Sequence, residues 1–85
     1  MSAPPAWYLY VLLNPAGIAY TGIAIDVDAR LAAHNAGSGA KFTRGRGPWT
    51  VTYMEGPFDK AAALRRELQV KRDRLLKTAL KADCS

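Results

Sequence analysis

Glu67 stands within a predicted helix, one turn from Ala63, Leu64 and Val70 rather than on a fully polar face. A carboxylate in this setting could hold a hard divalent cation, because such ions prefer oxygen ligands. The alternative is an ordinary i,i+4 ion pair with Lys71, which would stabilise the helix by only a few tenths of a kcal/mol. The residues alone leave both interpretations open.

Arg30 and the single histidine, His34, are four residues apart in another predicted helix. Side chains at this spacing are neighbours, with about 5–6 Å between their Cβ atoms, and here they flank Leu31 on the apolar stripe of the helix. The sequence therefore predicts a cation and an imidazole side by side at the edge of the core. The alternative is that both are boundary residues whose stems merely cover apolar surface.

Three tyrosines lie in the first two segments that are rich in aromatic and branched residues. Tyr8 and Tyr10 are two residues apart, the spacing that places both side chains on one face of a β-strand. Tyr20 lies in the following segment, and a hairpin would bring its ring near the other two. From the residues alone, packing in the core is the first interpretation of this group.

The charge of the chain is strongly positive for its size. Twelve Lys and Arg residues against seven Asp and Glu residues give a net charge of +5. Such a field attracts polyanions, so nucleic acid is the first partner expected; the alternative is that the charge only keeps the molecules apart in solution. Lys41, Arg44 and Arg46 stand among the glycines and prolines of residues 38–48, which predicts a basic loop.

Length and composition indicate a single small domain over residues 1–85. A chain of 85 residues has room for one core. The longest apolar run, Val11-Leu12-Leu13, falls far short of the roughly 20 residues that a membrane helix needs, and residues 1–6 carry no cation typical of a secretory signal. We therefore expect a cytoplasmic protein with no membrane partner.

Local patterns predict an α+β fold in the order β-β-α-β-α-α, with a small three-stranded antiparallel sheet and flanking helices. Apolar runs and alternation predict strands over residues 7–13, 18–23 and 49–54. Gly56-Pro57 is expected to end the third strand.

Two aspartates are placed to cap helices. Asp26 would cap a helix that runs through Ala36, and Asp59 would cap a second that runs to about Lys71. A third helix is expected from about residue 73 to residue 82. Residues 1–6 are expected to form a flexible N-terminus, and residues 73–85 a C-terminal helix and tail.

Taken together, these blocks resemble the GIY-YIG nuclease domain over nearly all of the chain, from Trp7 to about Arg72. The family is named for two tripeptides on its first two strands, whose places are taken here by Tyr8-Leu9-Tyr10 and Tyr20-Thr21-Gly22. Eight residues after Gly22, Arg30 matches the arginine of the family's first helix. His34 matches its histidine one turn further, and Glu67 matches its metal-binding glutamate. The matched blocks look most like the small stand-alone members of the family.

The resemblance implies a metal-dependent endonuclease that hydrolyses phosphodiester bonds in DNA, in repair, recombination or related DNA processing. Glu67 would hold a single Mg²⁺ or Mn²⁺ ion against a phosphate oxygen. Tyr10 would accept a proton or orient the attacking water, with Tyr20 beside it. Arg30 would contact the scissile phosphate, and His34 would donate to phosphate or pass a proton.

The resemblance also implies a set of contacts with nucleic acid, with DNA expected before RNA. Gly22 would let the nucleic-acid backbone come close to the end of its strand. The loop cations would hold flanking phosphates without reading bases, although a solvated cationic turn is the alternative. The expected nucleic-acid-binding residues are Gly22, Lys41, Arg44, Arg46 and Lys71.

A second function fits the same scaffold, namely a module that binds nucleic acid or another partner with little or no turnover. The matched catalytic set favours the nuclease, whereas the lack of a recognisable targeting domain favours the module. We expect a monomer or a weak homodimer, with Trp7, Leu12 or Cys84 as candidate dimer contacts. Cys84, the single cysteine, is otherwise expected to be an exposed thiol near the chain end.

Overall fold

The fold is a three-stranded antiparallel sheet with one helix on each side, seen in a computed structural model that describes residues 5–72. The chain forms β1 (Trp7–Leu13), β2 (Ala19–Ala24), α1 (Val27–Asn35), β3 (Thr50–Phe58) and α2 (Lys60–Arg72). A short 3-10 helix, η1 (Lys41–Thr43), lies in the loop between α1 and β3. The predicted α+β class and the three-stranded antiparallel sheet are confirmed.

The first strand lies at the centre of the sheet, whose strand order is β2-β1-β3. In the β1–β2 hairpin Tyr10 is opposite Gly22 and Leu12 is opposite Tyr20. Because side chains alternate along a strand, these residues all point to one face of the sheet. The hairpin predicted from the sequence thus brings Tyr20 to the same face as Tyr10.

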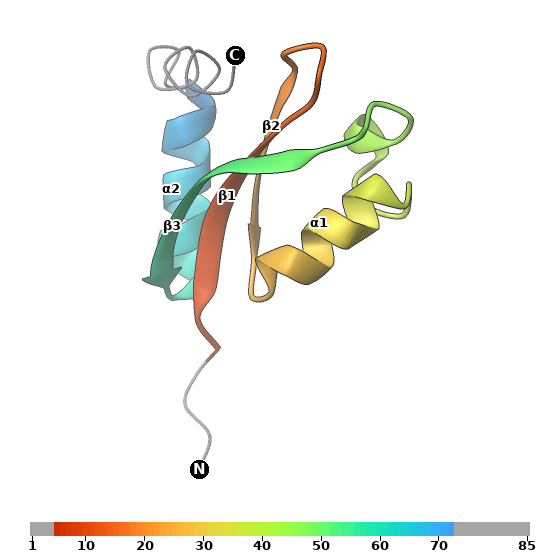
Figure 1. The fold of residues 1–85 in the computed structure, drawn as a ribbon. Coiled ribbons are helices and arrows are strands. Elements are labelled where there is room, and N and C mark those ends of the chain that lie inside the picture. Colours follow the sequence, from red (N-terminus) through yellow and green to blue (C-terminus); the bar gives the residue numbers. More distant parts are fainter. Residues whose placement is uncertain (1–4, 73–85) are drawn as a thin grey trace.

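Two small cores lie on opposite faces of β1, and α1 and α2 lie on opposite sides of the sheet (Figure 1). Tyr10 and Leu12 pack with Val27 and Trp49 on the α1 side. Leu9 and Val11 pack with Val70 on the α2 side. The continuous apolar run of the first strand is explained by burial on both faces. Leu12 is fully buried, so it offers no surface for a dimer contact.

Both predicted helix caps are present. The Asp26 carboxylate accepts a hydrogen bond from the Ala29 amide at 3.0 Å, and the Asp59 carboxylate accepts one from the Ala62 amide at 2.7 Å. These bonds satisfy amide groups that have no partner within the first turn of a helix. Gly37, with φ of +82°, follows α1 in the left-handed conformation expected of a helix stop.

The prediction that Gly56-Pro57 ends the third strand is wrong, because β3 continues to Phe58. The third strand lies at the edge of the sheet. An edge strand tolerates a proline, since a missing N–H on its open side costs no ladder hydrogen bond. The register of β3 against β1 shifts between Trp7 and Leu9, where this irregularity is absorbed.

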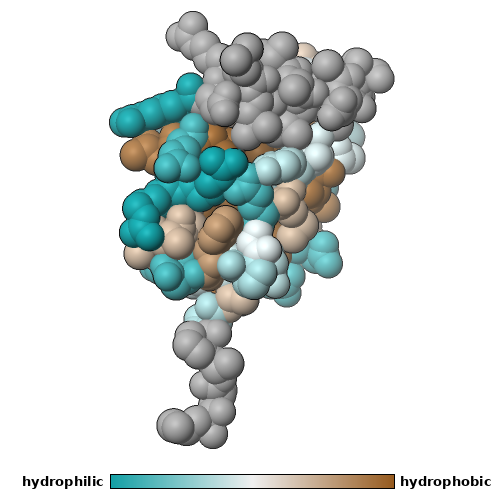
Figure 2. Space-filling model, turned by 90° about the vertical axis from the view of Figure 1, so that its left-hand side faces the viewer, coloured by the Kyte–Doolittle hydropathy of each residue, from teal (hydrophilic) through white to brown (hydrophobic). Residues whose placement is uncertain are grey.

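The predicted third helix and C-terminal tail, residues 73–85, lie outside the described residues. So do residues 1–4 of the predicted flexible N-terminus. Within residues 5–72, no helix has the length and apolar character needed to cross a membrane. On the face that carries α2, hydrophilic and hydrophobic residues are interspersed (Figure 2).

Candidate active site

The centre of the candidate site is a buried hydrogen bond between β1 and α1. The hydroxyl oxygen of Tyr10 lies 3.0 Å from Nε2 of His34. Both side chains are only 1% exposed. The sequence predicted a histidine at the edge of the core, but in the structure the His34 side chain is fully buried.

The other nitrogen of His34 is also engaged within the protein. Its Nδ1 lies 2.7 Å from the hydroxyl of Thr43, in η1, and 3.4 Å from the backbone amide nitrogen of Ala40. The Thr43 hydroxyl is also 2.8 Å from the carbonyl oxygen of Ala40. In this conformation His34 therefore has no free nitrogen to offer a phosphate.

Two glycines make room for this hydrogen-bonded pair. A Cβ atom on Gly22 would lie 2.6 Å from the Tyr10 hydroxyl and 2.8 Å from the ring carbon that bears it. A Cβ on Gly39 would collide with Nδ1 of His34 and would lie 2.9 Å from its Cα. The hydroxyl of Tyr10 thus occupies the space that a Cβ on Gly22 would fill. The glycine at this position therefore makes room for the Tyr10 side chain.

Tyr20 links the buried pair to the basic loop. Its ring centroid is 5.0 Å from that of His34 and 6.5 Å from that of Tyr10. On the loop, Phe42 stacks on Tyr20 at 6.0 Å, and the guanidinium carbon of Arg46 lies 4.8 Å from the centroid of the Phe42 ring. Four rings and one guanidinium therefore form a continuous layer from the sheet to the protein surface.

Arg30 and Glu67 act electrostatically on these rings from α1 and α2. Burial raises the pKa of Tyr10, and Arg30 acts against that rise. Burial and the charge of Glu67 raise the pKa of Tyr20, which Arg30 again opposes. Burial, together with Arg30, lowers the pKa of His34. The histidine is thus neutral at pH 7, and the two tyrosines are phenols before substrate or metal arrives.

Glu67 is half-buried on α2. Its Oε2 lies 3.8 Å from the Nζ of Lys71, so the i,i+4 pair anticipated from the sequence is present. This distance exceeds that of a hydrogen bond, which leaves the carboxylate oxygens free to take a ligand. Over the part of the chain that the structure describes, no group of three or more His, Cys, Asp or Glu side chains gathers as a ready metal cage.

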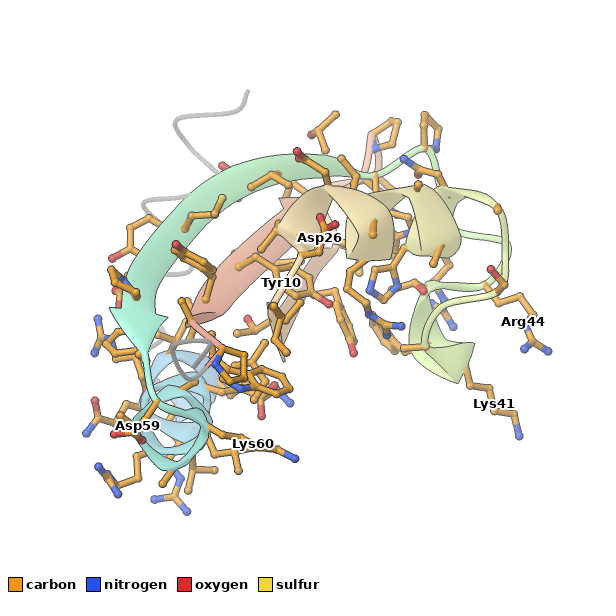
Figure 3. All side chains as sticks on the ribbon, turned by 90° about the horizontal axis from the view of Figure 1, so that it is seen from below. Tyr10, Asp26, Lys41, Arg44, Asp59 and Lys60 are labelled. Carbon is orange, nitrogen blue, oxygen red and sulfur yellow. The ribbon has the colours of Figure 1, made fainter. Side chains whose placement is uncertain are left out.

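The basic loop lies next to this cluster. Lys41 and Arg44 project away from the body of the protein, whereas Tyr10 lies in its interior (Figure 3). Arg44 donates from Nε to the carbonyl of Gly37 at 3.2 Å, and Arg46 lies over Phe42. The loop cations are exposed, and Arg46 is linked to Tyr20 through the ring of Phe42. Lys71 lies apart from them on α2, beside Glu67.

Asn35, Thr43 and Trp49 hold the loop in place and were not predicted from the sequence as site residues. The side chain of Asn35 accepts from the Trp49 amide at 2.6 Å and donates to its carbonyl at 3.1 Å. The indole N–H of Trp49 donates to the carbonyl of Thr43 at 3.1 Å. A single threonine in a glycine-rich loop has no sequence pattern that would reveal this role.

The fold and the site together define a class of protein. The model of the GIY-YIG catalytic domain matches residues 6–78, and the chain belongs to this family. The resemblance inferred from the sequence is thereby confirmed.

Within the family, proteins named UPF0213 are similar to this chain. A UPF0213 protein of Serratia proteamaculans is 48% identical over 67 residues, which make up 79% of this chain and 66% of the relative. One of Halobacterium salinarum is 47% identical over 64 residues, 75% of this chain and 83% of the relative. The chain spans slightly less than two thirds of the Serratia relative and 54% of one from Aeromonas hydrophila.

A solved structure has a similar fold. The solution NMR structure of the UPF0213 protein BH0048 from Bacillus halodurans is 37% identical in sequence and superposes with a TM-score of 0.52. The match covers 93% of this chain and 84% of that one. The strand and helix arrangement described above is thus shared with a relative of known structure.

Proposed function

We propose that this chain is a metal-dependent endonuclease that hydrolyses phosphodiester bonds in DNA, in repair, recombination or a related process. Membership of the GIY-YIG catalytic domain family makes nuclease chemistry on nucleic acid the expected class. The observation that carries the proposal is the hydrogen bond between Tyr10 and His34. A buried phenol held by a neutral imidazole, with an arginine and a carboxylate acting on it, is a site arranged for proton transfer.

Tyr10 is the proposed proton acceptor for the attacking water. A phenol with a pKa near 10 is a poor base at pH 7, and burial raises the pKa of Tyr10 further. Arg30 opposes that rise in pKa, first through hydrogen bonding to the Tyr10 side chain and then through its positive charge, and so favours the phenolate. In the reaction the water proton would pass to the phenolate oxygen of Tyr10 and the water oxygen would bond to phosphorus. The bond to the leaving sugar oxygen would break, with its electron pair staying on that oxygen, which then takes a proton from solvent water.

Arg30 has a second part in the proposal. Its side chain is exposed on α1, so it can reach a phosphate that approaches Tyr10. A guanidinium presents paired N–H donors that suit phosphate oxygens. Contact with the scissile phosphate would offset negative charge that builds up on it during attack.

Glu67 is the proposed ligand of one Mg²⁺ or Mn²⁺ ion. Its half-buried carboxylate, with only a long contact to Lys71 at 3.8 Å, suits a hard cation that keeps most of its waters and takes one or two carboxylates. When bound, such an ion supplies positive charge to the phosphate and the leaving oxygen. Glu67 already acts electrostatically on Tyr10 and Tyr20, so the ion would also favour their ionised forms.

The exposed cations of the loop are proposed to hold the phosphates that flank the cleaved bond. Arg46 approaches the site through the stack of Phe42 on Tyr20, and Lys41 and Arg44 are exposed on the same loop. Contacts of this kind fix the position of the nucleic acid but carry no base sequence. Lys71 would add a phosphate contact on the side of Glu67.

We further propose that residues 1–85 act as one domain in the cytoplasm, as a monomer or weak homodimer. Trp7 and Cys84 are the candidate dimer contacts that stay open, since Leu12 is buried.

The experiment is a cleavage assay on a panel of labelled duplex, branched and single-stranded DNA and RNA, with wild type and Tyr10→Phe side by side. Tyr10→Phe keeps the ring but removes the hydroxyl. Products from wild type that fall at least about a hundredfold in the variant would support the proposal. Binding of the panel without cleavage by wild type, in any divalent metal, would instead assign the chain as a binding module.

A further inference from the structure

Phe42 is the aromatic side chain most open to solvent among residues 5–72. It is 46% exposed, whereas the tryptophans, the tyrosines and Phe58 in that part of the chain are buried or half-buried. A single exposed apolar side chain is ordinary on a protein surface. What sets Phe42 apart is the chemistry of the residues around it.

The neighbours of this ring in the basic loop are cations. Lys41 precedes it, and Arg44 and Arg46 follow it, all three exposed. The guanidinium carbon of Arg46 lies 4.8 Å from the centroid of the Phe42 ring, which is a cation–π contact. The sequence has no Asp or Glu from residue 29 to residue 54. An exposed ring among cations, with no acidic residue in its stretch of chain, suits a polyanion that carries flat apolar groups.

The backbone that carries Phe42 is firmly held. Thr43, the next residue of η1, is only 1% exposed. Its hydroxyl donates to the carbonyl of Ala40 at 2.8 Å and lies 2.7 Å from Nδ1 of His34. Its own carbonyl accepts the indole N–H of Trp49 at 3.1 Å. The ring of Phe42 is thus presented by a fixed backbone, and a ligand that binds it orders little of the loop.

Phe42 lies next to the candidate active site. Its ring stacks on that of Tyr20, with 6.0 Å between the centroids and 22° between the planes. The ring of Tyr20 is in turn 5.0 Å from that of His34. A flat group bound at Phe42 therefore lies beside the residues proposed for catalysis.

We propose that Phe42 stacks on an unpaired nucleobase of the bound nucleic acid, while the exposed guanidinium of Arg46 turns from the ring to a neighbouring phosphate. Every base has a π face, so this contact accepts any sequence. Bases inside a duplex stack on one another and present only their edges in the grooves. The substrate class is therefore nucleic acid with unpaired nucleotides at the cleavage site, as in single strands or branched structures. Only the link to the cleaved bond rests on the proposed function.

The first test compares binding to single-stranded and duplex DNA in the presence of chelator. The probes are a labelled oligothymidylate of about 12 nucleotides and a labelled blunt hairpin. Phe42→Leu keeps an apolar side chain but removes the π face. We expect this variant to bind the single strand roughly tenfold more weakly than wild type and the hairpin almost equally well. The slope of log affinity against log salt should not change, because no charge is lost.

Two results of this test would overturn the proposal. Equal affinity of wild type and Phe42→Leu for the single strand would show that the ring contacts no base. An equal loss on the single strand and the hairpin would show that the ring supports the loop and not an unpaired base. Circular dichroism establishes that the variant is folded.

The second test detects the stacked base itself. A single fluorescent base, 2-aminopurine, is placed within the oligothymidylate, and its emission falls when it stacks on an aromatic ring. We expect this quenching with wild type and with Phe42→Trp, and its loss with Phe42→Leu. The matched control is Leu64→Ala, which removes an apolar side chain of 47% exposure from α2 and should leave the quenching unchanged. Undiminished quenching by Phe42→Leu would contradict the assignment of the ring.

The two proposals fail in different ways. Absence of cleavage by wild type would remove the nuclease but would leave the base contact standing, because binding is measured with chelator. Equal binding by wild type and Phe42→Leu would remove the base contact and leave the nuclease to be decided by the cleavage assay with Tyr10→Phe.

Discussion

Gly22 and Tyr10 face each other across the β1–β2 hairpin so closely that a Cβ on the glycine would lie 2.6 Å from the tyrosine hydroxyl. This is well inside van der Waals contact, so any side chain at Gly22 must displace the ring. The ring is buried and bonded to His34, which leaves it little room to yield. The glycine is therefore tied to the position of a proposed catalytic group.

Gly22→Ala is expected to lower the free energy of unfolding by about 1–3 kcal/mol, the usual cost of overpacking a core. It is also expected to lower the cleavage rate by more than the loss of folded protein accounts for. The physical reason is that the Tyr10 hydroxyl is pushed from its 3.0 Å contact with His34. Thermal unfolding followed by circular dichroism, together with the cleavage assay, checks both effects.

A double variant provides the control. Gly22→Ala with Tyr10→Phe removes the atom in closest contact, so the two changes should cost less stability together than their separate effects predict. Activity should stay as low as in Tyr10→Phe. Additive stability losses would show that the two residues do not interact as described.

Replacing Lys41, Arg44 and Arg46 together by Ala should weaken binding to all nucleic-acid sequences alike. Each phosphate contact that is lost should reduce the slope of log affinity against log salt by about 1. The measurement is fluorescence anisotropy with a labelled oligonucleotide over a range of salt concentrations.

The matched control removes the same charge from α2, with Lys60, Arg65 and Arg72, none of them a proposed phosphate contact, replaced by Ala. This variant should retain most of the salt dependence. An equal loss in both triple variants would mean that net charge, rather than the loop, attracts the nucleic acid.

The pair of Glu55 and Arg66 should make stability depend on pH. Arg66 donates to the two oxygens of Glu55 at 2.5 Å and 2.7 Å, and Tyr53 donates to the same carboxylate. Hydrogen bonding to Arg66 lowers the pKa of Glu55 in the folded state. The pair therefore stabilises the fold above the unfolded pKa of about 4.3, and this contribution is lost as pH falls through the lower, folded value.

Glu55→Gln is expected to reduce stability by about 1 kcal/mol at pH 7, because the pair is partly exposed and screened, and to flatten the loss of stability below about pH 4. Melting temperatures of wild type and variant from pH 7 to pH 3 give the comparison. Parallel curves would show that Glu55 does not link stability to pH.

The sequence predicted what depends on local pattern. The predicted hairpin brought Tyr20 near Tyr10, and the capping aspartates, Asp26 and Asp59, set the helix starts. The continuation of β3 through Pro57 was not predictable, since only the strand order shows that this strand lies at an edge.

The interior of the site was only partly predictable. Types and spacing identified His34 but placed it at the core edge, because the depth of a helical residue depends on how the helix packs. Thr43 was missed, since its role arises from a loop that returns to the helix nine residues later in sequence.

The most direct test of the central claim is cleavage by wild type and Glu67→Ala side by side, on the DNA structure that wild type cuts best, with Mg²⁺, with Mn²⁺ and with chelator. Asp28→Asn, a carboxylate change on the exposed side of α1, serves as the control. We predict products in wild type and the control that need a divalent ion, and none in Glu67→Ala, while that variant stays folded and still binds DNA. Undiminished, metal-dependent cleavage by Glu67→Ala would contradict the account.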